Sequence, residues 1–361
     1  MNLDDVEYFA ELDTQKMLDQ IDRLPAQLQT AWESGQTQPV PDWSGVTQVV
    51  IAGMGGSAIG GDLLKTYLQD KCPVPVIINR DYGLPAWAQG EGTLVIACSH
   101  SGETEETLSA FATALSRGCR LLAITTGGQL AREAAQAGIP VWQYQHHGQP
   151  RAAVGFSFGL LLAALRRLRL LDDPSGELYS AVQAMQEQQT SLVAGVPAVK
   201  NPAKRLAGQL VGRWVSVVGS GILAPVALRW KGQINELAKT WAQFEILPEA
   251  DHNTLAGVLN PEGLLSKTFV LFLQSPSDLP RNHLRSELTR KAMMLEGLNT
   301  DFVNAHGQNP LSHLWTCLHF GDYTAYYLAM AYGVDPSPVP AIENFKRELR
   351  AAGAEPGLPN P

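Results

Sequence analysis

The sequence predicts an α/β protein with two doubly wound parallel sheets, and three observations carry that prediction. The chain has 361 residues, enough for two domains of about 150 residues each. Strand, loop and helix patterns alternate along most of it. Most strand candidates are continuous apolar runs, such as the one at 93–98, which is typical of parallel strands that are buried on both faces.

The first half follows this order after a polar helical segment at 3–33 and a Gly- and Pro-containing linker at 33–41. Glycine or serine loops separate its strands from the helices that follow them. One helix is expected at 62–70, and another follows the loop at 99–106 and ends at about Arg117. The expected strands are 46–52, 74–79, 93–98, 120–125 and 140–144. Helices at 152–171 and around 178–192 then bridge to the second half.

The second half restarts the pattern. Its expected strands are 214–219, 268–274 and 300–304, and its expected helices are 224–241, 282–296 and 310–332. Each half opens with an apolar strand that runs into Gly and Ser, and about 50 residues later a second strand ends in a Ser-x-Ser loop. We interpret this similarity as a weak two-copy duplication.

Four units follow from these patterns. They are an N-terminal helical segment at 1–40, a first domain with bridging helices at 41–195, a second domain at 196–335, and a C-terminal turn and helix at 336–361. Residues 351–361 are expected to be frayed.

Composition excludes several classes of protein. Hydrophobic residues make up 45% and charged residues 17%, which excludes wholesale disorder. The formal charge of −8 argues against a nucleic-acid binder that relies on bulk electrostatics. The most apolar stretch, 154–165, is too short to cross a membrane, and the N-terminus lacks the pattern of a signal peptide. Four dispersed cysteines without a CxxC motif favour reduced thiols in a cytoplasmic protein.

Two loops are candidate phosphate sites. Gly53-Met54-Gly55-Gly56-Ser57 joins a strand to a helix, where glycines admit a ligand and the helix N-terminus presents free N–H groups. Ser99-His-Ser101-Gly-Glu-Thr104 follows another strand and offers three hydroxyls. Ligands bind at such carboxyl ends in doubly wound sheets. The alternative for either loop is an ordinary turn with a Ser or Thr N-cap.

A dinucleotide site is a second interpretation of the first loop. Gly53-x-Gly55-x-x-Ala58 fits the dinucleotide pattern, and Asp81 follows at about the expected distance. The motif is permissive, however, since Gly219-x-Gly221-x-x-Ala224 also matches it. The hydroxyl-rich loop 99–104 favours a compact phosphate clamp, which a dinucleotide-dependent dehydrogenase does not need.

Several motifs together make the chain resemble the sugar isomerase (SIS) domain family, and more narrowly its bifunctional phosphoglucose/phosphomannose isomerase branch. The resemblance covers almost the whole chain and implies two SIS-type doubly wound subdomains with helical extensions. It rests on Gly53-Met-Gly-Gly-Ser-Ala-Ile-Gly-Gly-Asp62, Ser99-His-Ser-Gly-Glu-Thr-Glu-Glu-Thr107, Pro150-Arg151-Ala, Asn235-Glu236-Leu, His252-Asn253, and Asp335-Pro336 followed by Phe345-Lys346.

The resemblance implies a role for each matching residue. The phosphate-binding set would be Gly55, Gly56, Ser57, Ser99, Ser101 and Thr104. Glu236 would be the general base that moves a proton between C1 and C2 through an enediolate, and Arg151 would stabilise that enediolate. His252 and Lys346 would open the sugar ring. The family takes this histidine from the neighbouring subunit, so the resemblance also implies a homodimer.

The residue chemistry fits these roles, although each residue has a plainer interpretation. A carboxylate beside apolar side chains can act as a base, and a cation can stabilise developing negative charge. The alternatives are a surface helix glutamate for Glu236, a surface arginine at a helix start for Arg151, a surface histidine for His252 and a solvated basic face for Lys346. The sequence predicts neither a cofactor nor a metal site, and His146-His147 has no further ligands at metal spacing.

Three positions depart from the family pattern. His100 and Glu103 replace bulkier aromatic and amide residues in the second serine loop. Val339 stands where a relative has a threonine linked to the mannose epimer, and Ser337 is the nearest hydroxyl. Activity on mannose 6-phosphate is therefore left open.

Three functions are weighed on this basis. The leading hypothesis is an aldose–ketose isomerase that interconverts glucose 6-phosphate with fructose 6-phosphate. The second is a non-catalytic module that senses a sugar phosphate, and the third is a dinucleotide-dependent oxidoreductase. In the first interpretation the second half has exchanged phosphate binding for the catalytic glutamate.

Overall fold

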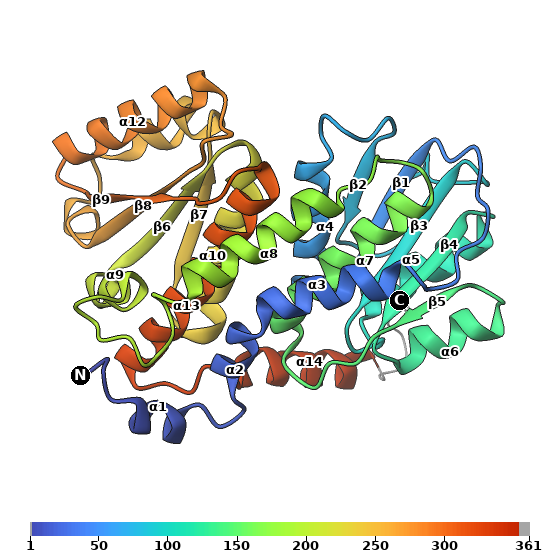
Figure 1. Ribbon diagram of the computed structural model, residues 1–361, viewed down its shortest axis with the longest axis horizontal. Helices are drawn as coiled ribbons and strands as arrows, with labels where there is room; N and C mark the ends of the chain where they lie inside the picture. Colours follow the sequence, from blue (N-terminus) through green and yellow to red (C-terminus); the bar gives the residue numbers. More distant parts are fainter. Residues whose placement is uncertain (1, 354–361) are drawn as a thin grey trace.

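Two parallel sheets, each flanked by helices, form the two halves of the molecule (Figure 1). We describe residues 2–353 of a computed structural model. Within them the first sheet has the strand order β2-β1-β3-β4-β5 and the second has the order β7-β6-β8-β9. All pairings are parallel, so the predicted α/β class with two parallel sheets is confirmed.

The first half contains the strands β1 (Gln48–Ala52), β2 (Val76–Asn79), β3 (Thr93–Ser99), β4 (Arg120–Thr125) and β5 (Val141–Gln143). Its helices are α4 (Gly55–Tyr67), α5 (Glu105–Ser116), α6 (Gly128–Gln136) and α7 (Val154–Arg167), preceded by the short 3-10 helix η1 (Pro150–Ala153). One buried cluster joins α5 and α6 to one face of this sheet, and a larger cluster covers the other face. Burial on both faces explains why the strand sequences are continuous apolar runs.

The second half contains β6 (Trp214–Gly219), β7 (Ala242–Ile246), β8 (Thr268–Gln274) and β9 (Asn299–Asn304). Its helices and short 3-10 turns are η2 (Gly221–Leu223), α10 (Ala224–Leu237), η3 (Glu249–His252), η4 (Thr254–Gly257), α11 (Glu262–Leu265), α12 (Pro280–Leu295) and α13 (Pro310–Tyr332). Helices α8 (Ser175–Gln189) and α9 (Pro202–Leu210) bridge the halves and pack against α13.

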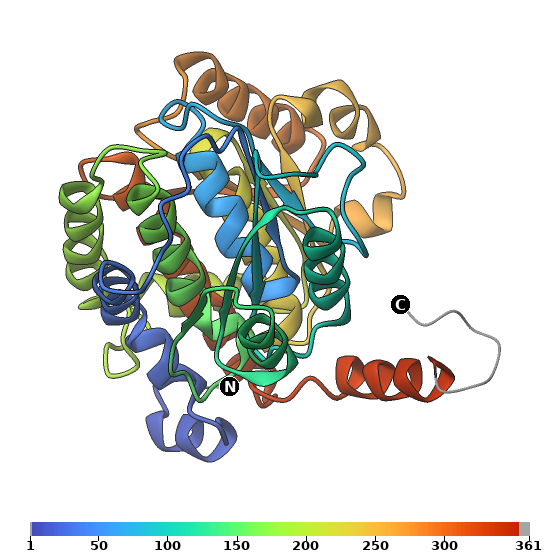
Figure 2. The same ribbon diagram turned by 90° about the vertical axis from the view of Figure 1, so that its right-hand side faces the viewer.

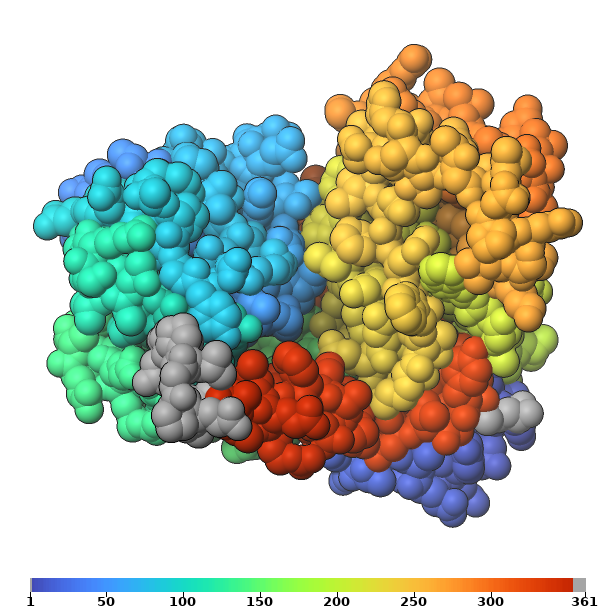
Figure 3. All heavy atoms as spheres, turned by 180° about the vertical axis from the view of Figure 1, so that it is seen from behind, coloured from blue at the N-terminus to red at the C-terminus, as the bar shows by residue number. Residues whose placement is uncertain are grey.

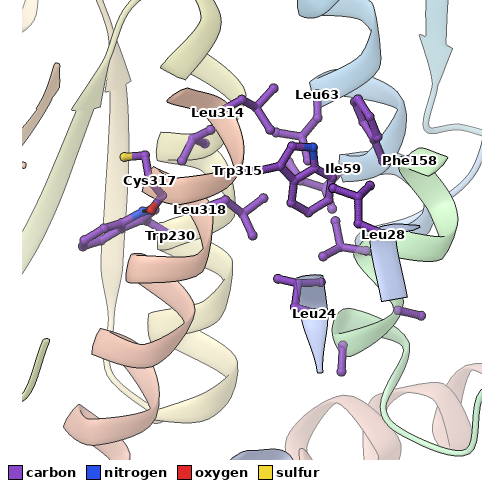
Figure 4. Packing of buried hydrophobic residues seen from close by; sticks show 14 of the residues in the cluster. Leu24, Leu28, Ile59, Leu63, Phe158, Trp230, Leu314, Trp315, Cys317 and Leu318 are labelled. Carbon is purple, nitrogen blue, oxygen red and sulfur yellow. Dashed lines mark hydrogen bonds between the residues drawn. The ribbon is translucent and has the colours of Figure 1, made fainter. Parts of the chain in front are cut away.

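A continuous hydrophobic core joins the two halves. Trp315 of α13 stacks edge-to-face on Phe158 of α7 with ring centroids 5.2 Å apart, beside Ile59 of α4 (Figure 4). Further along α13, Gly321 leaves room for Trp230 of α10, because a Cβ there would lie 2.2 Å from the indole nitrogen. The relative position of the sheets is therefore set by buried packing between them.

Two expected elements differ in the structure. The helix expected at 3–33 is three helices, α1 (Val6–Leu12), α2 (Met17–Asp22) and α3 (Leu24–Gly35). The first break lies between Leu12 and Met17, where the Asp13 carboxylate accepts hydrogen bonds from the amides of Met17 and Leu18, the first two residues of α2. The helix expected at 224–241 ends at Leu237, and strand β7, which the sequence analysis did not anticipate, follows it.

The last described helix, α14 (Pro340–Gly353), stands away from the body of the molecule (Figure 2). It includes positions 351–353, which were expected to be frayed, whereas 354–361 lie outside the described residues. Seen from behind, α14 lies below the hollow between the two halves (Figure 3). Residues 340–352 are all exposed.

Candidate active site

The two predicted phosphate loops lie side by side because their strands are neighbours in the first sheet. Ala52 of β1 pairs with Ala97 of β3, so Gly53 and Ser99 leave the same sheet edge. The approach is close: a Cβ on Gly53 would lie 2.8 Å from the carbonyl oxygen of Cys98. The first loop then enters α4 through Gly55, whose φ of +49° favours glycine.

The hydroxyl groups of the second loop form hydrogen bonds within the loop itself. Ser99 Oγ lies 2.8 Å from Thr104 Oγ1 and accepts a hydrogen bond from the amide of Gly102. Ser101 is exposed, and its Oγ accepts from the amide of Glu103 at 3.2 Å. Ser57, in the first turn of α4, is buried. The loops together offer hydroxyls and helix N-termini at one sheet edge, an arrangement that can hold an anion.

Arg151 connects this edge to the second half. Its side chain is only 4% exposed, and its Nη1 lies 3.4 Å from Glu236 Oε2. Its Nη2 donates to the carbonyl oxygens of Pro336 at 2.8 Å and Ser337 at 2.6 Å. Burial lowers the pKa of Arg151, although a guanidinium starts from so high a value that it remains charged. The site therefore contains a fixed buried cation.

The first loop packs directly on the segment that carries Arg151. A Cβ on Gly56 would lie 2.5 Å from the carbonyl oxygen of Pro150 and 3.1 Å from Arg151 Cα. Only glycine fits so close to a backbone without displacing it. The position of the guanidinium is thus tied to the position of the phosphate loop.

Glu236 projects from the last turn of α10 into a cavity of about 150 Å³ between the halves. Its side chain is 32% exposed. The lining residues come from the first loop and α4, from Arg80 and Arg151, and from one face of α10: they are Gly55, Gly56, Ile59, Arg80, Arg151, Leu228, Arg229, Gly232, Gln233 and Glu236. A carboxylate and three arginines therefore meet beside the phosphate loop.

Two of these arginines were missed by the sequence analysis. Arg80 follows β2 and pairs with Asp62 of α4 through both terminal nitrogens. Arg229 is buried with Asp322 of α13, and its Nη2 lies 2.8 Å from Oδ2. Arg229 could have been found from spacing, because positions 229, 232/233 and 236 share one face of a helix. Nothing in the sequence indicated Arg80.

The structure brings together Glu236, Arg151, Gly55 and Gly56, with Ser57, Ser99, Ser101 and Thr104 at the adjacent sheet edge. Among the residues described, the other two expected catalytic groups lie elsewhere. His252 is exposed at the end of η3, and Lys346 is exposed on α14. Within residues 2–353 no cluster of three or more His, Cys, Asp or Glu side chains is suited to a metal ion.

Comparison with known proteins assigns the family. A family model described as the bacterial phospho-glucose isomerase C-terminal SIS domain matches residues 199–349. A bifunctional phosphoglucose/phosphomannose isomerase from Caldicellulosiruptor bescii is 38% identical over 337 residues, which cover 92% of this chain and 98% of the relative. The chain belongs to the bifunctional phosphoglucose/phosphomannose isomerase family.

A second member of the bifunctional phosphoglucose/phosphomannose isomerase family, from Aquifex aeolicus, is 35% identical over 84% of this chain and 90% of its own length. A solved structure of a hypothetical protein from Thermus thermophilus has the same fold, with a TM-score of 0.73, 18% identity, and coverage of 94% of this chain and 91% of that one. The family-model match includes the Glu236 helix and α14 as far as residue 349.

No described helix is both long enough and apolar enough to cross a membrane.

Proposed function

We propose that this chain is an aldose–ketose isomerase that interconverts fructose 6-phosphate with glucose 6-phosphate and mannose 6-phosphate. The observation that carries the proposal is the 3.4 Å pairing of Arg151 Nη1 with Glu236 Oε2 in a cavity whose other wall is the first phosphate loop. The curated relatives named bifunctional phosphoglucose/phosphomannose isomerase support the same reaction.

Binding begins at the sheet edge in this proposal. The 6-phosphate takes hydrogen bonds from Ser57, Ser99, Ser101 and Thr104 and from backbone amides of Gly55 and Gly56. Helix N-termini complement the negative charge, so no lysine is needed there. The anionic group then anchors one end of the open-chain sugar, while C1 and C2 lie toward Glu236.

Proton transfer follows without a redox cofactor. In the aldose-to-ketose direction, Glu236 removes the proton from C2, and the electron pair left behind forms the C1–C2 double bond of an enediolate. The negative charge on O1 is stabilised by Arg151. Glu236 then returns a proton to C1, the hydroxyl proton of O2 passes to O1, and the ketose carbonyl forms at C2. Atoms and electrons balance within the sugar and one carboxylate.

Ring opening requires the two residues that lie outside the cavity. We assign it to Lys346 and to His252 of a second copy, in a homodimer. Two features support this assignment: His252 is exposed on η3, and α14 presents an exposed apolar stripe of Ile342, Phe345 and Leu349. A helix with such a face usually packs against a partner. We place the enzyme in the cytoplasm, consistent with four free cysteines within the described residues.

A non-catalytic sugar-phosphate sensor is the second candidate. It is favoured by one observation, the position of His252 and Lys346 away from the cavity in a single chain. The sensor binds fructose 6-phosphate but does not turn it over.

A coupled assay with both aldose phosphates tests these proposals. The wild-type protein is expected to convert fructose 6-phosphate to glucose 6-phosphate and mannose 6-phosphate. Glu236→Gln should lose turnover while it retains fructose 6-phosphate binding by calorimetry, and Glu245→Gln on β7 serves as the matched control. Binding without turnover in the wild type would establish the sensor, and full turnover by Glu236→Gln would refute the mechanism. If only glucose 6-phosphate forms, the enzyme does not act on the mannose epimer, the activity that Val339 left open.

A further inference from the structure

The carbonyl oxygen of Pro336 accepts hydrogen bonds from cations of both halves. Arg151 Nη2 donates from the first half at 2.8 Å, and Lys239 Nζ donates from the second half at 3.4 Å. Lys239 Nζ also donates to the backbone carbonyl of Glu236 at 2.5 Å. One ammonium therefore contacts the residue that carries the catalytic carboxylate and the turn that Arg151 holds.

The turn at 335–337 is anchored on further sides. Asp335 accepts hydrogen bonds from Thr14 Oγ1 at 2.5 Å and from the amide of Ser337 at 2.9 Å. Pro336 and Ser337 are buried. This turn brings together the N-terminal segment, the Arg151 segment and the end of α10, so its position affects the distance between Arg151 and Glu236.

The backbone at Lys239 directs its side chain back onto the helix. Its φ is +54°, in the left-handed region, where glycine is the usual residue after a helix. Lysine lacks that conformational freedom, but its side chain can reach the last carbonyl groups of α10. Glycine would end the helix equally well without making either contact of the ammonium.

We propose that Lys239 is a positioning residue whose charged ammonium holds the 335–337 turn against the end of α10, and that loss of this charge lowers turnover at alkaline pH. The inference rests on the proposed isomerase function. Lys239 acts through Glu236 and Arg151 rather than on the substrate.

The electrostatic surroundings place this titration in an accessible pH range. Although Lys239 is exposed overall, partial desolvation of its ammonium, followed by the nearby charge of Arg151, lowers the pKa of Lys239 to about 8, while Asp335 and Glu236 act in the opposite direction. Arg229 and Glu343 add their charges at Arg151. The ammonium is thus charged below about pH 8 and loses its charge above it.

The same shift predicts the opposite trend in stability. A lysine whose folded-state pKa lies below its ordinary value binds its proton less tightly in the folded chain than in the unfolded chain. Deprotonation of Lys239 therefore favours the folded state as the pH rises from about 8 toward 10.5. A loss of activity in this range would not arise from unfolding caused by this group.

Profiles of kcat against pH from 6.5 to 10 test the proposal in the wild type, Lys239→Arg and Lys239→Met. The wild-type kcat should fall with an apparent pKa near 8. Lys239→Arg, which stays charged, should move this fall upward by about one pH unit or more. Lys239→Met should reduce kcat by about ten-fold at pH 7 with little change in KM, and remove the fall. Lys231→Met on the preceding helix α10 is the matched control.

If kcat falls at alkaline pH in both Lys239 variants just as it does in the wild type, the inference is overturned while the isomerase function stays intact. An absence of turnover in wild-type protein that still binds fructose 6-phosphate would instead overturn the proposed function and this inference with it. Thermal unfolding of each variant shows whether it is folded. Lys239→Arg keeps a donor at the position, so it decides the matter if Lys239→Met does not fold.

Discussion

Arg151 and Glu236 meet across the two halves of the chain, with Nη1 and Oε2 separated by 3.4 Å. The arginine is buried and also bound to two carbonyl groups, so it is held independently of the glutamate. Glu236, by contrast, is one-third exposed and faces the cavity. A rigid cation beside an accessible carboxylate is the arrangement that proton abstraction next to a carbonyl requires.

Arg151→Lys should lower kcat strongly. The planar guanidinium contacts Glu236 and two carbonyl oxygens at once, and one ammonium on a flexible stem cannot reproduce that geometry. We expect a loss of about 10²–10³-fold, as for removal of one donor from an oxyanion site. Steady-state kinetics measure it, with Arg166→Lys at a half-buried position outside the cavity as control. A kcat equal to that of the control would remove Arg151 from the mechanism.

Gly56→Ala should weaken phosphate binding. The added Cβ would meet the carbonyl oxygen of Pro150 at 2.5 Å, so either the first loop or the Arg151 segment must move. We expect a loss of about 1–3 kcal/mol in stability, as for other overpacked positions. Calorimetric titration with inorganic phosphate and thermal unfolding measure the two effects. Gly176→Ala, where a Cβ would have open space, should leave both unchanged.

A mixture of Glu236→Gln and His252→Ala chains should recover activity that neither variant has alone. If His252 serves the neighbouring subunit, a mixed dimer contains one site with an intact glutamate and an intact histidine. Equal mixing makes half of the dimers mixed, so we expect up to about a quarter of wild-type activity after subunit exchange. Inactive mixtures in which mixed dimers are present would assign His252 to its own chain.

Phe345→Glu should weaken the proposed dimer. Phe345 is 63% exposed at the centre of the apolar stripe on α14, and a charge there would have to be desolvated on packing against a partner. Light scattering coupled to size exclusion should detect a shift toward monomer, together with lower activity. Val199→Glu, at an exposed position between α8 and α9, is the control. An unchanged dimer would show that α14 lies outside the interface.

Acid should destabilise the protein through His146. Its Nδ1 lies 2.9 Å from His100 Nε2, and burial, followed by the charge of His100, lowers the pKa of His146 to about 4. The unfolded chain takes up this proton near the ordinary value of 6.5, so stability present above pH 6.5 is lost as the pH falls toward 4. His146→Phe should flatten the fall in denaturation midpoint over this range.

His147→Gln is the control for that experiment, since His147 is exposed. Part of the acid sensitivity should persist in His146→Phe, because burial also lowers the pKa of His319 to about 4. An identical pH profile in wild type and His146→Phe would contradict the assignment.

The elements that the sequence predicted well are those whose burial is uniform. Strands β1, β3, β4 and β8 are nearly or fully buried, and their continuous apolar sequences revealed them. Strand β7 was missed because Ala242-Gln-Phe-Glu-Ile246 is a partly buried edge strand with no such run. The break before it occurs at a left-handed lysine, and neither glycine nor proline marks it.

The site was only partly predictable for a different reason. The loops and Glu236 lie in local motifs that a sequence displays directly. The partners of Arg151 at Pro336 and Ser337 are separated from it by 185 and 186 positions, so their contact depends on how the two halves pack. The role of Arg80 likewise depends on Asp62, which is adjacent only in the folded first half.

The hydrogen bonds from Arg151 to Pro336 and Ser337 also set a limit on when activity can begin during protein synthesis. The first sheet can fold once its own strands have left the ribosome, because domains generally fold as units. Arg151, however, acquires its backbone partners only when residues 336 and 337 have emerged. A nascent chain could therefore bind a sugar phosphate well before it could isomerise one.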